Sequence, residues 1–181
     1  MTTAPDAPNR PRSALLVILF AVYAVGLVAV VILKLPYLMV SGDDGIRVVN
    51  LVPFGGSIDR QGRFAWEEIA YNTAVFIPLG VYLSAMTRWN ATKRILVAAG
   101  VSVAFEMTQF AFGIGVSDIT DVISNTAGAV IGIGVHVATR KALGAKAPRV
   151  VTVAALVLTI IAVVAFAYLW HRNNVFMGPP P

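Results

Sequence analysis

Acid and amide side chains interrupt a long apolar stretch near the middle of the chain, FEMTQFAFGIGVSDITDVISN at residues 105–125. These polar residues are Glu106, Gln109, Asp118, Asp121 and Asn125. A carboxylate at membrane depth is energetically costly, so it is protonated, paired or hydrated there, and such residues often mark a substrate or ion pathway. The stretch is therefore the candidate functional site of the chain.

Helical spacing gathers these residues on two facing surfaces. Spacings of three and four residues place one group on a single helix face: Ser102, Glu106, Gln109 and Gly113. The same spacings define a second face: Asp118, Asp121, Asn125, Gly128 and Gly132. The short turn at residues 113–117 makes the two helices antiparallel neighbours. At the helical rise, Glu106 lies about 9 Å below Phe112 and Asn125 about 9 Å below Ile119, so we expect Glu106 and Asn125 at similar depth.

Part of the residue pattern of the second face is repeated earlier in the chain. Glu68, Asn72, Thr73 and Ala74 repeat the spacing of the residues from Asp121 to Ala127. Each helix would carry an acid at its outer mouth and an asparagine one turn deeper on the same face. Asn72 therefore joins the candidate site, and the two helical hairpins could form a parallel internal repeat.

Each polar residue also has a structural explanation. Asp118 is typical of a helix N-cap, and Asp121 lies in the first turn, where a carboxylate is favoured. Asparagine and glutamine commonly form hydrogen bonds between membrane helices. Glu106 has no lysine or arginine in either neighbouring helix, which leaves a ligand, water or a structural hydrogen bond as its partner. Because the chain has no cysteine, thiolate chemistry and disulfides are excluded.

Composition assigns the chain to the membrane proteins. It is 57% hydrophobic and 13% charged, with a mean hydropathy of +0.78, far from a soluble domain. Five apolar runs are long enough to cross a bilayer: Ala14–Leu33, Ile69–Met86, Ile95–Phe112, Asp121–Thr139 and Val150–Trp170. We predict an all-α polytopic bundle over residues 14–170, with a disordered cytoplasmic tail at 1–13 and a short C-terminal tail at 171–181. The first run is too long for a signal peptide and is predicted to be a retained anchor.

Basic residues predict the orientation. The formal net charge is +5, and nine of the fourteen lysines and arginines flank one side of the predicted bundle: Arg10, Arg12, Arg88, Lys93, Arg94, Arg140, Lys141, Lys146 and Arg149. The positive-inside rule then puts the N-terminus in the cytoplasm and the C-terminus outside. The surplus charge is topological and does not indicate nucleic-acid binding. We expect a multi-pass protein of the plasma membrane.

One long connection, residues 34–68, is predicted to face outside. It contains NLVPFGG, which is apolar yet unsuited to a regular helix because of its proline and glycines. It would lie on the outer surface, either as a loop resting on the bundle or as a lid in which Pro53 and Phe54 cover the site.

Several of these segments resemble the VanZ-like family of small bacterial membrane proteins. They are NLVPF at residues 50–54, YNTAVFIPLG at 71–80, the E-x-x-Q pair at 106 and 109, and SDITDVISNTAGAVIG at 117–132. The resemblance covers about residues 50–134. It implies a role in the cell envelope, and the namesake is associated with low-level resistance to the glycopeptide teicoplanin. Many family members carry an arginine shortly before D-x-x-D, where this chain has GIGVS.

Three functions remain open from the sequence. The first is binding of a polar ligand, such as a lipid head group or cell-wall precursor, in an outward-facing acidic pocket formed by these residues: Glu106, Gln109, Asp118, Asp121, Asn125, Asn72, Pro53 and Phe54. The second is a metal-dependent membrane enzyme for a lipid-linked substrate, in which Glu106, Asp118 and Asp121 hold Mg²⁺. The third is a purely structural role. No cofactor or catalytic nucleophile is assigned.

Overall fold

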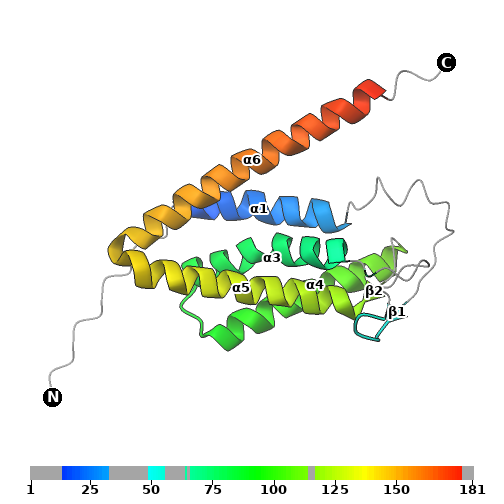
Figure 1. Cartoon of the computed structure of the whole chain (residues 1–181), viewed down its shortest axis with the longest axis horizontal. Helices are drawn as coiled ribbons and strands as arrows, with labels where there is room; N and C mark the ends of the chain where they lie inside the picture. The colour runs from blue at the N-terminus through cyan, green and yellow to red at the C-terminus, as the bar shows by residue number, and fades with distance from the viewer. Residues whose placement is uncertain (1–13, 33–48, 56–63, 65, 114–116, 177–181) are drawn as a thin grey trace.

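The chain is almost entirely helical in the computed structural model, which describes residues 14–32, 49–55, 64, 66–113 and 117–176 (Figure 1). The long helices are α1 (Ala14–Ile32), α3 (Trp66–Met86), α4 (Ala91–Phe112), α5 (Ile119–Leu143) and α6 (Ala147–Phe176). A 3-10 turn, η1 (Gly144–Lys146), joins α5 to α6, and two short strands are β1 (Val49–Asn50) and β2 (Ser117–Asp118). The all-α prediction is confirmed. The predicted tail at 1–13 and the end of the chain, 177–181, lie outside the described residues.

The helix ends agree with the sequence in some places and differ in others. α3 and α4 end at Met86 and Phe112, as expected. Gly113 ends α4 with a φ of 64°, a conformation that glycine adopts without strain. α3 begins at Trp66, so the last residues of the predicted long connection belong to a helix. α6 continues to Phe176, past the predicted end at Trp170.

Three segments have the length and hydropathy of a membrane span: Trp66–Met86, Ala91–Phe112 and Ile119–Val164. These mark the chain as a membrane protein. The number is smaller than the five expected for two reasons. The part of α1 whose side chains the structure describes, Ala14–Ala29, is shorter than a span, and the third segment runs from α5 through η1 into α6.

The closest packing joins α3 to α5. A Cβ atom built on Gly128 would overlap the carbonyl oxygen of Thr73, and one on Gly132 would overlap that of Ile77. Gly80 of α3 meets the carbonyl oxygen of Ala129 in the same way. The order of these contacts shows that α3 and α5 run parallel. The glycine pair Gly128 and Gly132 thus allows the close helix contact expected from its spacing.

Aromatic side chains complete the core around this pair. Phe76 of α3 is fully buried and meets Phe105 of α4 edge to face, with ring centroids 6.4 Å apart. α1 is attached by Tyr23, whose hydroxyl donates to the carbonyl oxygen of Val75 at 2.9 Å. The Tyr23 ring also lies 5.4 Å from the ring of Tyr82. These contacts fix α1 against α3.

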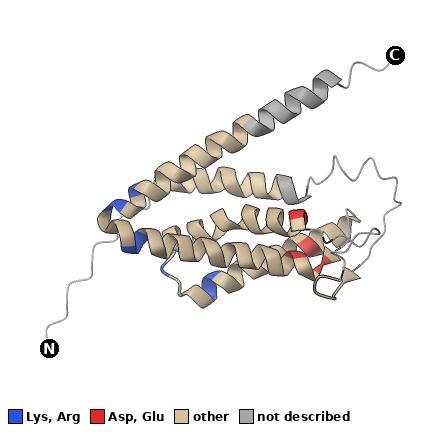
Figure 2. Ribbon diagram, in the orientation of Figure 1, with Lys and Arg blue, Asp and Glu red and all other residues tan. Residues whose placement is uncertain are grey.

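Charge divides the described part of the bundle into two ends (Figure 2). The end formed by η1 and the α3–α4 connection carries the basic residues, whereas acidic residues lie where α3 and α5 begin and α4 ends. We call these the basic end and the acidic end. The described residues at the acidic end include no lysine or arginine. The two sets of charges are therefore separated by the apolar length of the helices.

Candidate functional site

The acidic end is assembled from segments that lie far apart in the sequence. β1 pairs with β2 in parallel, with Val49 opposite Ser117 and Asn50 opposite Asp118. This pairing brings the segment before α3 against the start of α5. The candidate site therefore includes residues from the loop as well as from α3, α4 and α5.

Glu106 is buried, with 8% of its surface exposed. Its Oε2 atom accepts a hydrogen bond from the backbone N–H of Asp118 at 3.0 Å. The Ser117 hydroxyl donates to the carbonyl oxygen of Glu106 at 2.9 Å. A carboxylate at a helix N-terminus is favoured by the free N–H groups and the helix dipole. The structural hydrogen bond that the sequence left open for Glu106 is thus present, and it ties α4 to the start of α5.

Asp118 is the N-cap of α5, as its position predicted. Its Oδ1 atom accepts from the backbone N–H of Thr120 at 2.7 Å. Its Oδ2 atom accepts from the side-chain amide of Asn50 at 2.8 Å. The same side chain therefore caps a helix and holds the loop that contains β1.

The amides of the candidate site connect the helices in pairs. Asn72 of α3 donates to Oδ1 of Asp121 on α5 at 2.6 Å. Asn125 of α5 donates to the Ser102 hydroxyl of α4 at 2.9 Å, and both of these side chains are buried. Hydrogen bonding between helices, the structural role considered for these amides, is therefore present in both pairs.

The expectation that Glu106 and Asn125 share one depth is wrong. Asn125 meets Ser102, which lies one helical turn deeper than Glu106, whereas Glu106 meets the residue just before α5 begins. The cause is the position of β2. Ser117 and Asp118 lie beside Glu106, so the first turn of α5 forms below the last turns of α4. α4 therefore continues beyond Glu106 by about 9 Å, past the start of α5.

The remaining predicted residues lie around this arrangement. Gln109 is buried on the same face of α4 as Glu106. Phe54 donates its backbone N–H to the Thr120 hydroxyl at 2.9 Å, while its side chain and that of Pro53 are exposed. Pro53 and Phe54 thus lie beside the start of α5. Because the apolar side chains are exposed, the loop contacts the start of α5 through the Phe54 backbone N–H and through Asn50.

Sequence reasoning missed three residues of this network, Asn50, Ser117 and Thr120. Each had a signal: Asn50 begins the NLVPF segment, Ser117 directly precedes D-x-x-D, and Thr120 lies between its two acids. Their partners could not be read from the sequence, because Asn50 is separated from Asp118 by 68 positions.

The described residues contain no group of three His, Cys, Asp or Glu side chains placed to hold a metal ion. Glu106, Asp118 and Asp121 instead accept hydrogen bonds from different segments of the chain. The metal-dependent alternative therefore gains no support from the arrangement of these three carboxylates.

Comparison with known proteins extends the sequence resemblance. The family model described as VanZ/LLP1 matches residues 20–140. The chain belongs to the VanZ/LLP1 family. Protein VanZ of Enterococcus faecium is 32% identical over 154 residues, which cover 83% of this chain and 92% of that protein. No solved structure matches the chain.

The VanZ/LLP1 match includes every element of the acidic end that the structure describes. It contains the loop with β1, the beginning of α3, the second half of α4 and all but the last residues of α5. α6, in contrast, begins after the matched region. The hydrogen-bonded network of the acidic end is therefore part of the family region of this chain.

Proposed function

We propose that this VanZ/LLP1 chain is a multi-pass protein of the bacterial plasma membrane that crosses the bilayer five times. The five crossings correspond to α1, α3, α4, α5 and α6. The basic end faces the cytoplasm, because lysine and arginine concentrate on that side of membrane proteins. The N-terminus is then cytoplasmic, and the acidic end and the C-terminus face outside.

This orientation predicts the result of a reporter fusion after Pro181. A phosphatase that is active only outside the cytoplasm should be active there, and a fluorescent protein that matures only in the cytoplasm should stay dark. Fusions after Leu143, at the basic end, serve as the control and should give the opposite pattern. A fluorescent Pro181 fusion would contradict the proposed topology.

The proposed function is the binding of a polar ligand of the cell envelope, such as a lipid head group or a cell-wall precursor, at the acidic end. The observation that carries it is the gathering of buried and half-buried acids and amides from three helices at one end of the bundle. Such residues are costly in a membrane and commonly serve substrates or ions.

The hydrogen bonds of the network are compatible with a ligand. Each carboxylate oxygen has two lone pairs, so Oδ1 and Oδ2 of Asp118 can each accept a further bond beyond those from Thr120 and Asn50. The internal bonds hold the carboxylates in fixed positions before a ligand arrives. Such preorganisation lowers the entropy cost of binding. In this proposal Glu106, Asp118 and Asp121 supply charge, while Gln109, Asn125 and Asn72 orient the ligand.

The resemblance to VanZ-like proteins, whose namesake is associated with teicoplanin resistance, suggests a test of the proposal. Expression of the chain in a susceptible Gram-positive host should raise the minimal inhibitory concentration of teicoplanin above that of the empty vector. Glu106→Gln should return it to the empty-vector level. The glutamine side chain keeps an oxygen for the Asp118 N–H but removes the charge, so the protein level in membranes should be unchanged by immunoblot.

Glu67→Gln is the matched control. Glu67 is exposed in the first turn of α3, so Glu67→Gln removes a negative charge in the same way but outside the buried network. The Glu67→Gln variant should keep the wild-type resistance. Full resistance in Glu106→Gln at equal protein level would contradict a ligand-binding role for the Glu106 charge. A wild-type chain that leaves the inhibitory concentration unchanged would contradict the link to teicoplanin.

A further inference from the structure

An apolar turn projects from the acidic end beside α5. Residues 49–55, which we call the finger, begin with β1 and continue into a turn closed by a hydrogen bond from the Gly55 N–H to the Val52 carbonyl oxygen at 2.9 Å. The Val52 N–H donates to the side-chain oxygen of Asn50 at 3.1 Å. The finger therefore satisfies several of its backbone groups internally.

Polar and apolar groups of the finger point in different directions. Asn50 and the backbone N–H of Phe54 bond to Asp118 and Thr120 at the start of α5. Leu51 and Val52, in contrast, are 72% and 64% exposed. The finger is thus amphipathic, with a polar side against the bundle and an apolar tip directed away from it.

Phe54 adopts an unusual backbone conformation in this turn. Its φ is 61°, and it is the only described residue other than glycine with a positive φ. Side chains with a Cβ atom are strained there, and strain of this kind is kept where the surrounding structure requires it. Here the Phe54 N–H is held by Thr120, and its ring lies 6.3 Å from that of Phe64. The conformation fixes the direction in which the tip of the finger points.

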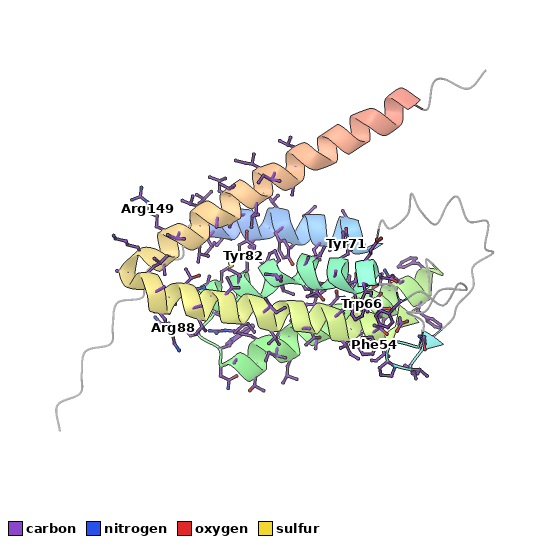
Figure 3. All side chains as sticks on the ribbon, viewed as in Figure 1. Phe54, Trp66, Tyr71, Tyr82, Arg88 and Arg149 are labelled. Atoms are coloured by element: carbon purple, nitrogen blue, oxygen red, sulfur yellow. The ribbon has the colours of Figure 1, made fainter. Side chains whose placement is uncertain are left out.

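The finger lies at the depth of the aromatic residues that begin α3. The ring of Phe64 is 4.4 Å from that of Trp66, whose side chain is 69% exposed. Figure 3 shows Phe54 and Trp66 at the same end of the bundle. Exposed tryptophan at the end of a membrane helix is typical of the boundary between lipid and water. The finger is therefore level with the expected surface of the membrane.

We propose that the finger inserts its apolar tip, Leu51 and Val52, into the lipid leaflet at the acidic end. The exposed tip lies at the same end of the bundle as the exposed side chain of Trp66, which begins α3. Irregular backbone does not enter the hydrocarbon core exposed to lipid, so the tip stops in the interfacial region. This inference needs neither the proposed ligand nor the proposed orientation.

The absence of cysteine from the chain allows a direct test. Single-cysteine variants Leu51→Cys and Val52→Cys carry a nitroxide label and are reconstituted in phosphatidylcholine vesicles. Leu158→Cys on α6 is the reference for lipid exposure, and Thr92→Cys at the basic end is the reference for water exposure. Power-saturation EPR then measures collisions with oxygen, which concentrates in lipid, and with a water-soluble nickel chelate.

Both labels on the finger should collide with oxygen more than with the chelate, with ratios closer to Leu158→Cys than to Thr92→Cys. Chelate accessibility equal to that of Thr92→Cys would overturn the proposal. Low accessibility to both reagents would also overturn it, because protein would then cover the tip. Spectral broadening that disappears on dilution with unlabelled protein would identify a second copy of the chain as the occupant and would reject the lipid.

Discussion

Gly132→Ala should lower the thermal stability of the purified protein in detergent. We expect a comparable loss from Gly128→Ala and Gly80→Ala and a smaller effect from alanine at the other described helical glycines. The new methyl group would overlap the carbonyl oxygen of Ile77, which is backbone and cannot rotate away. α3 and α5 must then separate along their closest contact. Overpacking of this kind costs about 1–3 kcal/mol, and more where the backbone must move. The fraction of protein that remains monodisperse after heating, followed by size-exclusion chromatography, measures the effect.

Gly134→Ala provides the control on the same helix, because no atom lies within 4 Å of a Cβ built there. Alanine is a better helix former than glycine by about 0.5–1 kcal/mol in water, so this variant should melt at or slightly above the wild-type temperature. If Gly132→Ala and Gly134→Ala melt alike, the close approach of α3 and α5 does not stabilise the protein.

Glu106→Ala has the second large expected effect. The substitution removes the carboxylate oxygen that accepts a hydrogen bond from the backbone N–H of Asp118, the N-cap residue of α5. That N–H is then left without this acceptor. Loss of a hydrogen bond to a charged group, or an unsatisfied buried donor, costs about 1–3 kcal/mol. We expect a lower melting temperature and less protein in the membrane fraction.

Glu106→Gln separates stability from charge. The amide oxygen can accept from the Asp118 N–H, so the melting temperature of this variant should lie much closer to wild type than that of Glu106→Ala. An equal loss of stability in both variants would mean that the negative charge, and not the hydrogen bond, holds α5 in place. In that case the resistance assay on Glu106→Gln would report folding as well as binding.

The acidic end combines structural and proposed ligand-binding roles in the same residues. Asp118 caps α5 and holds the loop by accepting a hydrogen bond from Asn50. Asp121 accepts a hydrogen bond from the side-chain amide of Asn72 on α3. A ligand that bound these carboxylates would therefore contact α3, α5 and the loop at once. Binding there would stabilise the relative positions of the segments that the network already joins.

Several features follow from the sequence alone. Long apolar runs require helices in a membrane, because every backbone group must be satisfied without water. Spacings of three and four residues fix which side chains share a helix face. The N-cap role of Asp118 and the close contact through Gly128 and Gly132 follow from local chemistry, and both occur in the structure. The resemblance to VanZ-like proteins also follows from short sequence segments, and the family match agrees with it.

Only the tertiary structure decided which residues the polar and glycine faces of the helices contact. Periodicity gives the direction of a side chain around its helix but not the register of one helix against another, which depends on packing and on the path of the connections. Because β2 lies beside Glu106, α5 begins deeper along α4 than the sequence predicted. Glu106 therefore contacts Asp118, and Asn125 contacts Ser102. The same register placed the glycines of α5 against α3 and brought Asn50 of the loop to the α5 cap. These contacts join residues distant in sequence, and no local pattern specifies them.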